Sequence, residues 1–159
     1  MRKEDFSSED WRLVVSAPSL VGLAVSAASP SGPLGVIKEM FVVGAAISDL
    51  AREREENTLI QELMDDIRHH ETKTLRPEGA TQMEEARAWA LTELAGVPEA
   101  LDRAGGGPEA DEYLQWLVAV AVRVAEAAKE GSVFGLGGEQ VTDAEDVAIG
   151  EVGEALGIT

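Results

Sequence analysis

The sequence lacks cysteine and is poor in aromatic and basic residues, and each shortage excludes a class of protein. None of the 159 residues is cysteine, so disulfide scaffolds, thiol nucleophiles and cysteine-ligated metal sites are excluded. Only 13 Lys and Arg stand against 30 Asp and Glu, a formal net charge of -17. This balance argues against a nucleic acid or an anionic membrane surface as a partner, because both are bound by clustered basic residues. Aromatic residues make up 4% of the chain, so the core must consist mainly of aliphatic and small side chains.

A long uninterrupted hydrophobic run is also missing. The uncharged stretch from Leu13 to Ile37 is broken by Pro18, Pro30 and Pro33, whereas a membrane span needs about 20 consecutive apolar residues. The residues before this stretch are acidic rather than basic, unlike the start of a secretory signal. We therefore expect no membrane span, no export signal and a cytoplasmic location.

Helix signals dominate what is present. The spacing of apolar residues and the near absence of strand patterns predict an all-α protein, a single domain over residues 1–159 with six or seven helices. Pro18 predicts a break between a helix near 8–16 and another near 18–28, because proline lacks an amide hydrogen and clashes with the preceding turn. Capping boxes at Thr58, Thr81 and Thr142 predict three further helix starts. Gly96 and Gly157 are predicted to end helices.

A weak internal repeat divides this domain. Ala27-Ala28, followed after five residues by Leu34-Gly35, returns 100 residues later as Ala127-Ala128 and Phe134-Gly135. Each copy is an apolar helix, a glycine-containing loop and a second helix, so pseudo-repeat halves at 8–70 and 81–157 are one interpretation. The alternative is a chance match in a chain rich in alanine and glycine.

One stretch near the C-terminus resembles a known family. An Ala-rich segment, Val124–Gly131, ends in the pair Glu130-Gly131, and a glycine loop leads to a valine-to-acid helix start at Val141–Glu145. This pattern resembles the signature of the TerB-like helical family associated with tellurite resistance. The chain differs from that pattern in having Glu at the position of the usual Asp and in having a longer loop. The resemblance implies an all-helical cytoplasmic protein of a stress response, without established catalysis, that binds divalent cations.

Carboxylates around this motif permit a cation site. Hard cations such as Ca²⁺ or Mg²⁺ are bound by several carboxylate and carbonyl oxygens that converge around a loop. The residues predicted to supply them are Glu126, Glu130, Glu139, Asp143 and Glu145. The alternative interpretation is that Glu145 closes a capping box and Glu126 is a solvated surface residue.

A second group of candidate metal ligands lies at the end of the predicted helix 58–70. Its members are Asp65, Asp66, His69 and His70. Carboxylate and histidine side chains three or four residues apart share one helix face, and di-iron bundles use this spacing. These are the only two histidines of the chain, so a site of the di-iron type would need a second subunit. The alternative is a solvated helix end with histidines placed favourably in the helix dipole.

Three functions are consistent with these patterns. The first is a non-enzymatic TerB-like protein that binds a divalent cation or a protein partner. The second is a metal-dependent helical-bundle enzyme that uses the Asp65, Asp66, His69 and His70 cluster. The third is a dimeric interaction module that packs a face of small residues on α-helix 108–130, among them Ala121, Ala125 and Ala128. No phosphate-binding loop or Gly-x-Ser-x-Gly elbow is present. We therefore expect neither a P-loop enzyme nor a hydrolase with a serine nucleophile.

Overall fold

The described residues fold into a bundle of seven α-helices and one 3-10 turn. The computed structural model describes residues 1–28, 33–79, 82–132 and 143–158, and within the helices it describes side chains except at 33–42, 128–132 and 143–145. Every regular element in these ranges is helical, which confirms the all-α prediction. The elements are η1 (Lys3–Asp5), α1 (Ser8–Ser26), α2 (Pro33–Arg52), α3 (Thr58–His69), α4 (Met83–Leu94), α5 (Val97–Arg103), α6 (Pro108–Ser132) and α7 (Asp143–Ala155).

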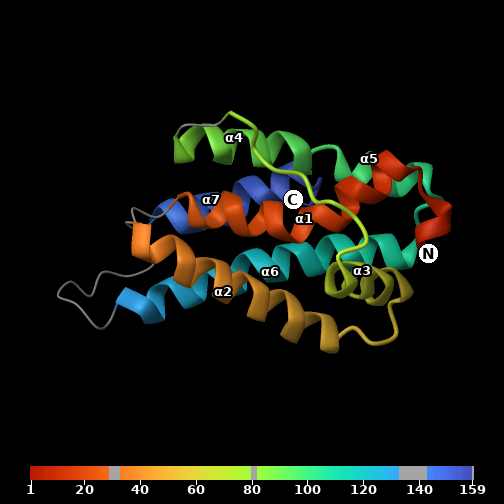
Figure 1. The fold of residues 1–159 in the computed structure, drawn as a ribbon, viewed down its shortest axis with the longest axis horizontal. Helices are drawn as coiled ribbons and strands as arrows, with labels where there is room; N and C mark the ends of the chain where they lie inside the picture. The colour runs from red at the N-terminus through yellow and green to blue at the C-terminus, as the bar shows by residue number, and fades with distance from the viewer. Residues whose placement is uncertain (29–32, 80–81, 133–142, 159) are drawn as a thin grey trace.

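Helix α1 is the central element. It contacts α2, α3, α4, α5, α6 and α7, and Figure 1 shows α4 on one side of it with α2 and α6 on the other. Ser7 caps its start, because the Ser7 hydroxyl accepts a hydrogen bond from the Asp10 amide at 3.1 Å. Most of the side chains of α1 are buried, and Val14, Ala17 and Val21 are fully enclosed. A helix with this much buried surface fixes the position of the elements around it.

The predicted break at Pro18 is wrong, because α1 continues through this residue. A proline at position 18 removes the amide that would bond to the carbonyl of Val14 in the helix. The hydroxyl of the fully buried Tyr113, on α6, donates a hydrogen bond to this carbonyl at 2.7 Å. A side chain from another helix thus replaces the missing donor.

Several predicted helix ends are confirmed and others shift. Gly157, with φ +69°, follows α7 in the left-handed conformation, as predicted. Helix α4 ends just before Gly96, as predicted, but this glycine has φ −82° rather than a left-handed conformation and joins α4 directly to α5. The cap of α3 is Asn57 rather than a box at Thr58, since Asn57 Oδ1 accepts from the Ile60 amide at 3.1 Å. The boxes predicted at Thr81 and Thr142 involve residues outside those described.

The core runs along the contacts of α1 with its neighbours. Its largest buried side chains include Trp116, Leu59, Leu94 and Leu117, so aliphatic residues do fill most of it. Trp11 is also buried, at the end of α1 nearest the N-terminus. Across the ranges whose structure is described, no helix is both long and apolar enough to cross a membrane.

Candidate functional site: a pocket between α1, α2 and α3

Most of the carboxylate side chains predicted to bind a cation near the C-terminus lie outside the described residues. Glu126 is an exposed residue of α6. Glu130 belongs to α6, and Asp143 and Glu145 belong to α7, but their side chains lie outside the described residues, as does Glu139 altogether. The cation site predicted from these residues therefore stays a prediction.

Asp66 of the second predicted cluster forms a buried hydrogen-bond network. Its carboxylate is 2% exposed and accepts hydrogen bonds at 2.8 Å from Lys3 Nζ and from the indole Nε1 of Trp11. Thr72 donates two more, from its amide at 2.9 Å and from its hydroxyl at 2.8 Å. The network joins α3 to the N-terminal turn, to α1 and to the segment that follows α3.

These contacts lower the pKa of Asp66 below its usual value. Burial is the largest single influence and opposes the charged form. Hydrogen bonds from Lys3, Trp11 and Thr72 favour the charged form, and together they outweigh burial. Asp66 is therefore an ionised structural residue whose oxygens already have four donors.

The other members of this cluster point to separate partners. Asp65 forms an exposed ion pair with Arg68, and Nδ1 of His69 lies 2.9 Å from the carbonyl oxygen of Asp65. His70 adopts the left-handed conformation, φ 54°, and ends α3. Within the described part of the chain, no three Asp, Glu or His side chains are grouped in a way that would hold a metal ion.

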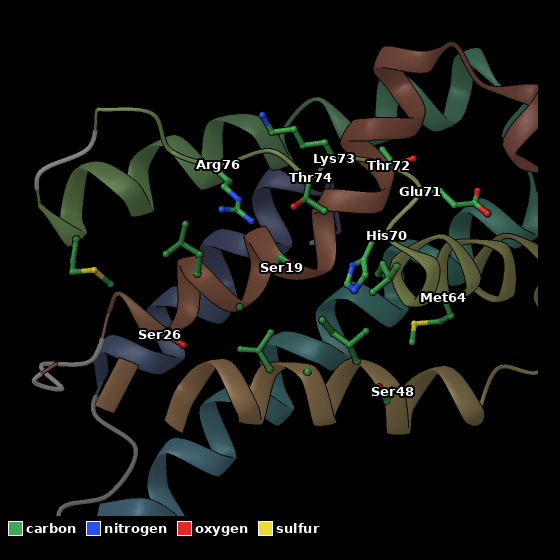
Figure 2. Close-up of a pocket in the computed structure, with 17 residues that line it drawn as sticks. Ser19, Ser26, Ser48, Met64, His70, Glu71, Thr72, Lys73, Thr74 and Arg76 are labelled. Carbon is green, nitrogen blue, oxygen red and sulfur yellow. The ribbon is translucent and has the colours of Figure 1, made fainter. Parts of the chain in front are cut away.

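A pocket with a volume of about 840 Å³ lies between α1, α2 and α3. The segment that joins α3 to α4, residues 70–79, forms one wall of it and is called the connector below. Figure 2 shows the pocket between the ribbons of α1 and α2, with the connector passing over α1. Its apolar lining comes from four helices and consists of Leu23, Val43, Ile47, Met64, Ile67 and Met83.

Two glycines shape the walls formed by α1 and α2. A Cβ atom at Gly22 would lie 2.5 Å from Cγ1 of Val43, so glycine is required for α1 and α2 to approach this closely. A Cβ atom at Gly44 would meet no atom within 4 Å. Gly44 lines the pocket, so its missing side chain leaves open space on the pocket wall.

Hydrogen bonds hold the connector in place although it has no regular structure. The Leu75 amide donates to Oγ of the buried Ser16 at 2.9 Å, and Nε of Arg12 donates to the carbonyl of Lys73, also at 2.9 Å. Thr72 is bound to Asp66, as described above. The connector is thus fastened to α1 and α3 at Thr72, Lys73 and Leu75, and this part of the pocket wall is held in place without a ligand.

Polar side chains also line the pocket, and most of them come from the connector. The Oγ atom of Ser26 is buried and has no hydrogen-bond partner in the part of the chain that the structure describes. His70, Lys73 and Arg76 come from the connector, and Figure 2 shows the imidazole of His70 directed between α1 and α2. An apolar cavity with a small number of polar groups is the usual form of a small-molecule site.

The sequence points to His70 as a candidate functional residue but contains no motif that indicates the pocket. His70 was singled out as a metal ligand, whereas its side chain lines this apolar cavity. The apolar lining residues follow ordinary helical spacing, and the connector residues form no motif. Glycines within helices, such as Gly22 and Gly44, are the local signal that could have indicated close approach or open space.

The chain was compared with protein-family models, with curated proteins and with solved structures, and it matches none of them.

Proposed function

We propose that this chain is a non-enzymatic binding module that takes a small ligand with an apolar body into the pocket between α1, α2 and α3. The observation that supports this most directly is the volume of about 840 Å³, which falls within the range of roughly 300–1,000 Å³ typical of small-molecule sites. The cytoplasmic setting predicted from the sequence is part of the same proposal.

The energetics favour an apolar ligand. Each methylene group that leaves water for the apolar lining contributes about 0.8 kcal/mol. The wall made by the connector is already ordered through Ser16, Arg12 and Asp66, so binding loses little conformational entropy there. Among the described residues the buried Ser26 hydroxyl has no partner, which costs roughly 1–3 kcal/mol, and a polar atom of a ligand would offset this cost.

The polar lining favours binding over catalysis. A hydroxyl nucleophile needs a general base within hydrogen-bond reach. The hydroxyl-bearing lining residues include Ser19, Ser48 and Thr74. In the described part of the chain none of them is hydrogen-bonded to His70, whose position would otherwise suit a base.

Filling the pocket tests the proposal. Gly44→Leu places a side chain in the open space of the pocket, while Gly150→Leu is the matched control, a helical glycine on α7 that also has no atom within 4 Å of its Cβ position. Both substitutions replace glycine by a good helix former, so neither should destabilise the fold.

Fluorescence of the neutral apolar dye Nile red gives the readout. We expect the wild-type protein and Gly150→Leu to bind the dye with equal affinity, and Gly44→Leu to bind it at least tenfold more weakly. Equal binding by all three proteins, or no binding by the wild-type protein, would contradict the proposal.

Divalent-cation binding, as the TerB-like motif implies, is a second function that the sequence motif alone supports. Its test is thermal unfolding of chelator-treated protein with Ca²⁺ or Mg²⁺ added back, since a ligand at about 100 times its dissociation constant adds roughly 2.7 kcal/mol to the stability. A rise in Tm that Glu130→Gln abolishes would support the site, and no rise would refute it.

A further inference from the structure

Arg76 is a cation without an ion-pair partner among the described residues of a strongly acidic protein. Most other described Arg side chains contact an acid, as in the pairs Arg87–Glu151 and Arg54–Glu112. Within the described residues Arg76 forms no ion pair or hydrogen bond, although the chain carries 30 acidic residues against 13 basic ones. The pocket wall is therefore a place where a positive charge is left available.

The Arg76 side chain extends toward α1, which forms one wall of the pocket. Figure 2 shows its side chain extending from the connector toward α1, whereas Lys73 extends on the other side of the connector. The lining also includes Glu71, but its carboxylate accepts a hydrogen bond from Lys3 Nζ at 2.8 Å and is directed away from the cavity. Glu71 thus already has an ion-pair partner in Lys3, whereas Arg76 has none among the described residues.

We infer that the ligand of this pocket is an amphipathic anion, an inference that depends on the proposed function. Its apolar body would lie on the surface formed by α1 and α2, and its anionic head would bind the guanidinium of Arg76. The planar guanidinium group donates two parallel hydrogen bonds to carboxylate or phosphate oxygens. A neutral molecule of the same length would use only the apolar surface.

The test compares amphiphiles that share one chain length and differ in the head group. Dodecanoate, dodecyl phosphate and the neutral dodecanol are titrated below their aggregation limits against protein loaded with Nile red. Wild-type protein is compared with Arg76→Gln and with Arg123→Gln, which removes an exposed cation of α6 outside the pocket lining. The two anions separate a carboxylate head from a phosphate head.

The wild-type protein should bind at least one of the anions about two- to fivefold more tightly than dodecanol, the range of an exposed ion pair. Arg76→Gln should remove this preference and leave dodecanol binding unchanged, and Arg123→Gln should keep the preference. The preference should also weaken as salt is added, because the head group and the exposed Arg76 are screened.

The outcomes separate this inference from the function on which it depends. If dodecanol binds as tightly as both anions, or if Arg76→Gln keeps the preference, the anionic ligand is refuted and the apolar pocket stands. If neither dye nor amphiphile binds, the proposed function itself fails. A wild-type dimer in sedimentation that dissociates in Gly44→Leu would assign the pocket to a second copy of the chain and overturn the inference.

Discussion

The network around Asp66 should be the most sensitive polar point of the fold. Replacing it by Asp66→Asn keeps the shape of the side chain but removes its charge and turns an acceptor into a donor. Lys3 Nζ, Trp11 Nε1 and the Thr72 hydroxyl all donate to one carboxylate oxygen, and the Thr72 amide donates to the other. The side chain of Asn has a single oxygen, so its NH2 group must face one of these two sets of donors. At least one buried donor of the network is then left without a partner.

The expected loss follows from the number of hydrogen bonds. A hydrogen bond to a charged group contributes about 1.5–3 kcal/mol, and breaking a buried charged pair costs roughly 3–5 kcal/mol. Lys3 is 44% exposed, so water can replace part of its interaction. The main loss therefore comes from Trp11 and Thr72, and we expect Asp66→Asn to lower the free energy of unfolding by about 3 kcal/mol.

Urea unfolding measures this difference, and the neighbouring residue supplies the control. Asp65→Asn makes the same chemical change one position earlier, where the carboxylate is 65% exposed and paired with Arg68. An exposed ion pair of this kind contributes at most about 1 kcal/mol, so this variant should stay close to wild type. Equal losses in the two variants would refute the structural role assigned to Asp66.

The same carboxylate should give a distinct acid response. Because the pKa of Asp66 is lower in the folded protein than in the unfolded chain, its contribution is complete above the unfolded value, about 3.9. The contribution is lost as the pH falls through the folded pKa. Stability measured from pH 6 to pH 2 should therefore fall more steeply below about pH 4 in the wild-type protein than in Asp66→Asn. Parallel curves would contradict the lowered pKa.

Three further predictions concern α1 and the glycines. Tyr113→Phe should lower stability by about 1–3 kcal/mol, because it removes the donor to the Val14 carbonyl. Pro18→Ala should reduce this loss, because it restores a helical amide that can donate to the same carbonyl. Additive effects in the double-mutant cycle would refute the proposed coupling of Tyr113 to Pro18. Gly22→Ala should destabilise by about 1–3 kcal/mol, since its Cβ would lie 2.5 Å from Val43; an unchanged urea midpoint would count against this close contact. Gly44→Ala should instead raise stability by up to about 1 kcal/mol, and a lower Tm would show that the space around Gly44 is filled.

Local signals explain why the helices were predictable from the sequence. Apolar spacing identifies most of the helices, and glycines such as Gly157 end them through backbone conformations that few other residues adopt. Such features act within a few residues, so a single sequence displays them. The 3-10 turn at Lys3–Asp5 was not predicted, and its Lys3 contacts α3 through Asp66.

Contacts between distant residues explain what was missed. The predicted break at Pro18 follows from local chemistry but is wrong, because Tyr113, 99 residues from its acceptor Val14, supplies the missing hydrogen bond. Asp66 was assigned to a metal cluster from its spacing to His69, whereas its donors Trp11 and Lys3 are 55 and 63 residues away. The pocket has no sequence motif, since its shape depends on how closely α1 and α2 pack at Gly22.

The most direct test of the pocket as a ligand site is an NMR titration of the wild-type protein with dodecanoate, with backbone amide shifts assigned. Binding in the pocket predicts saturable shifts concentrated in residues 19–26, 43–48 and 64–76, the segments that contain nearly all of its lining residues, with α5 unaffected. Shifts spread evenly over the surface, or concentrated on α5 and the start of α6, would contradict the account.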